Sequence, residues 1–280
     1  MHSQTRYTLA TAAILAATPA ASALIVDGSA MARPHNGFIG AWAGSSAVPI
    51  AQRWIITAQH VGGVAGGAFS MQGSLYTSDL VVRHPTDDLM LVRVTSDLPA
   101  WHGLATLPAP ITANASNAAN PRVETSALVA MPTVVLAGMG RTNGAPHAAG
   151  GWDWTGPAAE TWGQNSLLGV FNSLLGTRFD LNLPEAIAHE ASYAVNDSGG
   201  AMLLPFADGS LRLIGVAVGA SPFGYTMQGS MGYALNLAPF IPWIESVVGA
   251  SLVGPGSTPT PGSAALLTMA GVLIASRRRR

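Results

Sequence analysis

Residues 196–200 read Asn-Asp-Ser-Gly-Gly, and the apolar run Ala-Met-Leu-Leu follows at 201–204. A serine held between an aspartate and two glycines has a backbone that can turn sharply, so that amide N–H groups can converge near its hydroxyl. An acyl-transfer nucleophile needs this arrangement. A glycine-rich β-turn between two strands has the same composition, so this segment alone leaves both interpretations open.

Two upstream segments combine an apolar strand with a polar residue at one end. Residues 53–60 read Arg-Trp-Ile-Ile-Thr-Ala-Gln-His, which predicts a buried strand ending in a small turn that presents His60. Residues 87–94 read Asp-Asp-Leu-Met-Leu-Val-Arg-Val, which places carboxylates before a second apolar strand. Taken singly, the histidine is consistent with a structural polar residue, and the paired acids with a turn or cap.

Together, and in this order, the segments resemble the motifs of the trypsin-like serine peptidases, which have the chymotrypsin fold. Residues 57–60 correspond to the family's Thr-Ala-Ala-His, 88–91 to Asp-Ile-Ala-Leu, and 196–200 to Gly-Asp-Ser-Gly-Gly. Weaker matches at 25–28, 136–141 and 240–244 extend the resemblance over residues 25–246. It implies an all-β fold of two six-stranded antiparallel β-barrels, with the active site between them and a short C-terminal helix.

The resemblance also assigns roles to individual residues. Ser198 attacks a peptide carbonyl, His60 takes its proton, and Asp88 orients the imidazole. Asp87 is the local rival, but Asp88 has the family's spacing to the following apolar residues. The backbone amides of Asn196 and Ser198 form the oxyanion hole. A serine-type endopeptidase with a protein or peptide substrate is thus implied, and its mechanism requires no cofactor and no metal.

Two departures from the family's pattern bear on activity. Asn196 stands where the family has a glycine whose backbone conformation is costly for other residues, and asparagine is the cheapest substitute. Val218 stands where the family has a serine that hydrogen-bonds the aspartate, so one orienting bond is expected to be missing. These departures leave open a second function, a catalytically impaired peptidase-like domain that serves as a surface binding or scaffold protein.

The resemblance also locates the pocket for the substrate side chain that precedes the cleaved bond. Its floor is Ser192, and its walls are Val218, Gly219, Ala220 and Met231. An uncharged floor disfavours cleavage after Lys or Arg, because a buried cation would lack a counter-charge. A methionine in the wall shortens the pocket. We therefore expect cleavage after small or apolar residues.

The N-terminal segment has the features of a secretory signal. Arg6 precedes an apolar stretch, and Ala-Ser-Ala at 21–23 is the small-x-small pattern that a signal peptidase cuts. Residues 1–23 are therefore predicted to be a signal peptide, and 24–250 the peptidase domain. In the family, the activated N-terminus pairs its ammonium with the aspartate before the nucleophile, here Asp197. The sequence leaves open whether Leu24 is trimmed or Asp197 is held otherwise.

The C-terminal segment is predicted to be a sorting or anchoring signal. A Pro/Gly/Ser-rich linker at 251–262 leads into a segment at 263–280, where a short apolar run ends in four arginines. This segment resembles the PEP-CTERM sorting signal of diderm bacteria, although Pro-Thr-Pro-Gly at 259–262 lacks the family's glutamate. We expect transient contact with the membrane or a sorting enzyme, and a secreted or cell-surface location reached through the periplasm. A weak membrane tether is the alternative.

Composition excludes several other classes. The 280 residues are 49% hydrophobic and 10% charged, which rules out wholesale disorder, and the 32 glycines and 19 prolines favour short strands and turns. Removing Arg6 and the four C-terminal arginines from the 13 basic residues leaves eight against 14 acidic residues. Such an acidic body lacks the basic surface that nucleic-acid binding requires. There is no cysteine, so stability must come from packing.

Overall fold

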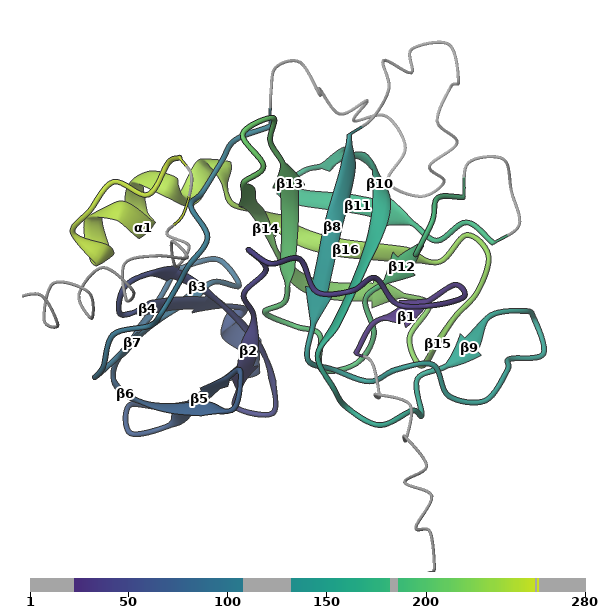
Figure 1. The fold of residues 1–280 in the computed structure, drawn as a ribbon, viewed down its shortest axis with the longest axis horizontal. Helices are drawn as coiled ribbons and strands as arrows, with labels where there is room; N and C mark the ends of the chain where they lie inside the picture. The colour runs from purple at the N-terminus through teal and green to yellow at the C-terminus, as the bar shows by residue number, and fades with distance from the viewer. Residues whose placement is uncertain (1–22, 108–131, 182–185, 255, 257–280) are drawn as a thin grey trace, which may run out of the picture.

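The computed structural model describes residues 23–107, 132–181, 186–254 and 256, and most of these form two closed β-barrels placed side by side (Figure 1). The predicted signal peptide, except Ala23, lies outside the described residues. The sorting segment at 263–280 and most of the linker before it lie outside them as well.

The first barrel closes in the order β2-β3-β4-β7-β6-β5, with every neighbouring pair antiparallel. Its strands are β2 (Gly40–Trp42), β3 (Ser45–Ala51), β4 (Trp54–Thr57), β5 (Ala68–Met71), β6 (Ser74–Arg83) and β7 (Met90–Val94). Apolar residues alternate into its interior, where Trp42, Ala47, Ile55, Phe69 and Val92 belong to one buried cluster.

The second barrel closes in the order β8-β10-β11-β16-β14-β13. Its strands are β8 (Thr133–Gly138), β10 (Thr161–Phe171), β11 (Leu174–Arg178), β13 (Ala201–Pro205), β14 (Leu211–Ser221) and β16 (Met231–Asn236). When the strands of each barrel are numbered along the chain, both barrels close in the same order, 1-2-3-6-5-4. The two halves of the domain are therefore topological repeats.

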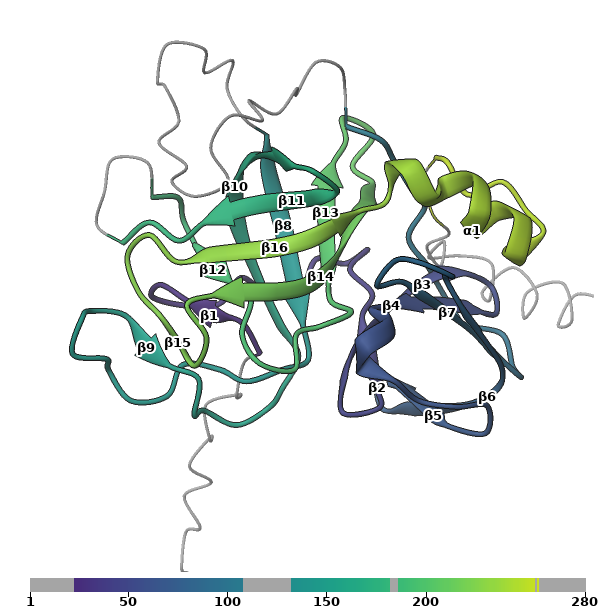
Figure 2. The ribbon, with the colours of Figure 1, turned by 180° about the vertical axis from the view of Figure 1, so that it is seen from behind.

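Four short strands and three short helices complete the described chain. β1 (Ile25–Val26) pairs with β12 (Ala191–Ser192), and β9 (Trp152–Asp153) pairs with β15 (Tyr225–Thr226). The helices are the 3-10 turns η1 (Gln59–Val61) and η3 (Ala238–Phe240) and the α-helix α1 (Ile241–Val248). Figure 2 shows α1 leading from β16 of the second barrel to the side of the first. The predicted fold, two six-stranded barrels and a short C-terminal helix, is confirmed.

The two barrels share one apolar cluster. Val48 and Ile56 of the first barrel pack in it with Leu203 and Val216 of the second, and Ile244 of α1 joins them. All five side chains are fully buried. Interiors packed to this degree resist sliding, so the cluster holds the barrels in a fixed relative position. Within the described residues, no helix is long and apolar enough to cross a membrane.

Candidate active site

His60 and Asp88 are brought together by strand pairing within the first barrel. β4 and β7 are antiparallel neighbours, with Thr57 opposite Met90 at the end of the ladder. His60 lies just beyond one strand and Asp88 just before the other, so the two side chains meet. Nδ1 of His60 is 2.6 Å from Oδ2 of Asp88, and the His60 backbone N–H donates to Oδ1 at 2.8 Å. This two-point contact fixes the imidazole ring against the carboxylate.

Asp87 is engaged elsewhere. Its carboxylate accepts a hydrogen bond from the Thr86 hydroxyl at 2.6 Å and lies 3.1 Å from Nδ1 of His84. The structure therefore makes Asp88, rather than its neighbour Asp87, the partner of the His60 ring.

Ser198 reaches the histidine from the second barrel, across the interface. Its Oγ is 2.7 Å from Nε2 of His60, so one line of hydrogen bonds joins Asp88, His60 and Ser198. The turn before β13 holds the serine in place. Asn196 has a φ of 71° and Gly199 a φ of 83°, the left-handed conformation that asparagine and glycine tolerate best. A Cβ at Gly199 would overlap the backbone oxygen of Ser46, so this position requires glycine.

Ser46 of β3 attaches the Ser198 loop, residues 193–200 between β12 and β13, to the first barrel, and the sequence patterns do not predict this role. Its backbone N–H donates to the carbonyl of Ser198 at 3.0 Å, and its hydroxyl donates to the carbonyl of Asn196 at 3.3 Å. The same hydroxyl accepts the N–H of Met139 at 2.8 Å. No local pattern marks this serine, because its partners lie far along the chain. Only the docking of the barrels identifies it.

Two backbone amides, both within two residues of Ser198, have no acceptor in the described structure. Within the described part of the chain, neither the N–H of Asn196 nor that of Ser198 donates to another residue. They are therefore available to a negatively charged oxygen next to Ser198.

The pKa shifts of His60 and Asp88 favour an ionised Asp88 carboxylate beside the His60 imidazole. The hydrogen bond that the Asp88 carboxylate accepts from the ring raises the pKa of His60 above its usual value, although burial opposes the shift. Burial by itself raises the pKa of Asp88, but the hydrogen bonds from the ring and the N–H of His60 outweigh it and lower that pKa. Such a histidine can accept a proton from a hydroxyl and hold it as an imidazolium.

Asp197 is held by main-chain groups. Its Oδ1 accepts the N–H of Gly140 at 2.9 Å, and its Oδ2 accepts the N–H of Ala194 at 2.8 Å. The side chain is fully buried, and burial raises its pKa well above the usual range while these two amides oppose the shift. Leu24, the first residue after the predicted signal cleavage, is also fully buried.

The predicted pocket residues lie on the short strand β12, which carries Ser192, and on β14 and β16 of the second barrel. Ser192 is 1% exposed, and its hydroxyl has no hydrogen-bond partner among the described residues. A Cβ at Gly232 of β16 would lie 3.6 Å from that hydroxyl, so Ser192 is next to β16. Met231 is 9% exposed and pairs with Ser221 of β14.

The other predicted wall residues, Val218, Gly219 and Ala220, run along the exposed end of β14. Val218 is partly buried and packs against the shared apolar cluster, and it offers no side-chain donor to Asp88. The described residues contain no group of three or more His, Cys, Asp or Glu side chains able to hold a metal ion.

No protein-family model matches this chain, and no curated protein matches it in sequence. Solved structures do match. One is neuropsin, a serine protease expressed in the limbic system of mouse brain, with 14% sequence identity and a TM-score of 0.56. The match covers 79% of this chain and 99% of the neuropsin chain. The chain therefore has the two-barrel fold of the trypsin-like serine proteases.

Proposed function

We propose that this protein is a serine endopeptidase in which Ser198 is the nucleophile, His60 the general base and Asp88 the group that orients the base. One observation carries the proposal. The hydrogen bonds between His60 and Asp88 and between Ser198 and His60, 2.6 and 2.7 Å long, form a continuous line although the residues come from two barrels. Nucleophilic catalysis by a weak nucleophile needs such a line.

In the proposed reaction, Ser198 Oγ attacks the peptide carbonyl while its proton passes to Nε2 of His60. The carboxylate of Asp88 stabilises the resulting imidazolium. The N–H groups of Asn196 and Ser198 donate to the negatively charged oxygen of the tetrahedral intermediate. The C–N bond then breaks, and the imidazolium gives its proton to the leaving amine. A water molecule, deprotonated by His60, hydrolyses the acyl-enzyme and frees Ser198.

We further propose that the residue before the cleaved bond is small or apolar. The uncharged hydroxyl of Ser192 supports this, because it offers no counter-charge to a buried Lys or Arg side chain. Met231 adds no support, because its side chain approaches Gly176 of β11 and lies on the face of β16 opposite to the one that Gly232 turns toward Ser192. The exposed end of β14 offers backbone groups along which an extended peptide could pair.

Export is part of the proposal and rests on the sequence of the two ends. The signal pattern at 1–23 and the linker, apolar run and arginines at 251–280 support a secreted or cell-surface protease of a diderm bacterium. Passage through the periplasm and transient contact with a sorting enzyme or membrane are implied.

The alternative, an impaired peptidase-like scaffold, depended on Asn196 and Val218. Asn196 adopts the left-handed conformation that the position requires. His60 keeps both contacts with Asp88, one from the ring and one from the backbone N–H, although Val218 adds no hydrogen bond. Both observations favour the enzyme.

Covalent labelling tests the proposal. A serine-directed phosphonate probe should label the wild-type protein, and Ser198→Ala should abolish labelling without lowering the unfolding temperature. The matched control is Ser246→Ala, which removes an exposed hydroxyl on α1 and should leave labelling unchanged. A folded wild-type protein that neither reacts with the probe nor hydrolyses any peptide would refute the proposal.

A further inference from the structure

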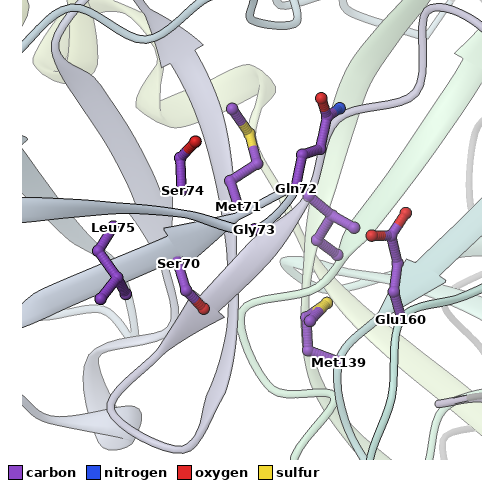
Figure 3. A pocket seen from close by; sticks show the side chains of 9 residues that line it. Ser70, Met71, Gln72, Gly73, Ser74, Leu75, Met139 and Glu160 are labelled. Atoms are coloured by element: carbon purple, nitrogen blue, oxygen red, sulfur yellow. The ribbon is translucent and has the colours of Figure 1, made fainter.

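A cavity of about 250 Å³ lies between the barrels, outside the site described above (Figure 3). The β5–β6 hairpin of the first barrel forms one side, and two residues of the segment between β8 and β10 form the other. Its lining residues are Ile39, Ser70, Met71, Gln72, Gly73, Ser74, Leu75, Met139 and Glu160. The volume is below the roughly 300–1,000 Å³ of sites for small-molecule ligands, so it suits a single side chain.

A row of small residues leads from the Ser198 loop to this cavity. Ser46 of β3 lies opposite Ala41 of β2, and Ala41 lies opposite Ser70 of β5. Opposed residues on neighbouring strands share one face of a sheet. The hydroxyl of Ser46 contacts the second barrel through Asn196 and Met139, so this face is turned toward the second barrel. Ser70, at the end of the row, lines the cavity, as does Met139.

The spacing between the strands of this row gives the distance from the cavity to the Ser198 loop. Neighbouring strands are about 4.8 Å apart, so Ser70 lies about 10 Å from Ser46, whose N–H binds the Ser198 carbonyl. An extended peptide advances about 3.4 Å per residue, so the cavity is two to four residues from the cleaved bond.

The cavity is on the side of Ser198 that faces away from β14. The N–H of Gly199 donates to Ala217 of β14, whereas the N–H of Ser46 in β3 donates to Ser198 itself. The Ser198 loop thus lies between β14 and β3. If the acyl half of the substrate follows the exposed end of β14, the leaving half passes over the row in β3, β2 and β5.

The lining combines an apolar floor with one carboxylate. Ile39 and Met71 are 1% and 2% exposed, and none of the nine lining residues is basic. The Glu160 carboxylate is held by the indole N–H of Trp162, which donates to Oε1 at 2.8 Å, while Arg33 lies 3.6 Å from the same oxygen. Among the described residues no hydrogen bond engages Oε2. Long cationic side chains, with an apolar stem and a charged head, match such a lining.

We propose that this cavity receives a lysine or arginine side chain from the leaving half of the peptide substrate, and that Glu160 determines this specificity. The proposal rests on the proposed peptidase function and deepens it. The protease would then distinguish substrates on both sides of the cleaved bond, with an uncharged residue before the bond and a basic residue two to four positions after it.

Quenched fluorescent peptides test the proposal, all with alanine before the bond. One series carries arginine at the second, third or fourth position after the bond, and the matched series carries citrulline, which has the same shape without the charge. The wild-type protein should cleave one arginine peptide about five- to tenfold faster than its citrulline partner. Glu160→Gln keeps the acceptor for Trp162 and should remove this preference. Asp97→Asn, which also removes one exposed negative charge, should retain it.

A chromogenic alanine anilide separates this proposal from the proposed function, because it has no leaving peptide. If the anilide is hydrolysed but arginine and citrulline peptides are cleaved equally at all three positions, the cavity proposal is wrong and the peptidase stands. A preference that survives Glu160→Gln assigns the specificity to other residues and also overturns it. If the anilide, both peptide series and the phosphonate probe all fail to react, the proposed function itself is wrong.

Discussion

The two barrels share one topology but differ in the length of their connections. In the first barrel, residues 43–44, 52–53 and 72–73 are two-residue links between paired strands, and only two connections are longer. Those two carry His60 and Asp88. In the second barrel, the connections at 139–160 and 179–200 are long, and they carry Glu160 and Ser198. Connections held by a rigid scaffold are where functional residues concentrate, and the residues proposed to act in this chain lie on such connections in both halves.

A second comparison concerns two histidines of the first half. His102 is 1% exposed, and burial lowers its pKa to about 4, although hydrogen bonds with Leu211 and Phe38 oppose the shift. His60 is partly exposed and has a raised pKa because of Asp88. His102 therefore stays neutral near pH 7, and its ring joins the backbone at Phe38 to the backbone at Leu211 by hydrogen bonds. His60 can exchange a proton.

The largest effect should come from removing the proposed nucleophile of the second barrel or the proposed base of the first. Ser198→Ala and His60→Ala should each lower kcat by about 10⁶-fold, because each breaks the same line of hydrogen bonds. The double variant should be no slower than either single variant, since the two groups act as a unit. Steady-state kinetics with an alanine anilide checks this. If the free-energy losses of the two single variants added up in the double variant, Ser198 and His60 would act independently.

Asp88→Asn should have the next largest effect. The ring of His60 would lose its ionised acceptor, and kcat should fall by about 10⁴-fold with little change in KM. The matched control is Asp87→Asn, which alters a carboxylate bound to Thr86 and should leave kcat nearly unchanged. A larger loss in the control than in Asp88→Asn would reverse the assignment of the two aspartates.

The pH profile should show the raised pKa of His60. The base must be neutral, so kcat/KM should fall as the pH drops through the folded-state pKa, by about tenfold per unit well below it. The midpoint should lie above 6.5, the usual value for histidine. A hydrolysis profile of the wild-type protein measures it. A midpoint below 6.5 would show that burial outweighs the contribution of Asp88.

The smallest effect should come from the serine that joins the barrels. Ser46→Ala removes the hydroxyl contacts with Asn196 and Met139 and should cost about 1–3 kcal/mol in the free energy of unfolding. We expect kcat to fall by about tenfold, because the Ser198 loop keeps only its backbone bond to β3. Urea denaturation and kinetics check both. Ser96→Ala, which removes an exposed hydroxyl just after β7, is the control.

Much of the fold and site could be predicted because the signals are local. The apolar runs before His60 and after Asp88 predict strands, and antiparallel pairing of β4 with β7 brings their ends together. The Asn-Asp-Ser-Gly-Gly turn has its own signal as well, since its left-handed positions fall on asparagine and glycine. These features depend on residues close in the chain or on one strand pair.

Other features arise only when the barrels dock. Ser46 meets Asn196 across 150 positions of sequence, and nothing near either residue indicates the contact. The cavity beside Glu160 joins a hairpin of one barrel to a connection of the other. The sequence by itself determined the strands, the sharp turn and the candidate nucleophile, base and acid, because propensity and spacing act over a few residues. The tertiary structure decided how the Ser198 loop is held and where the cavity beside Glu160 lies, because both depend on the packing of one barrel against the other.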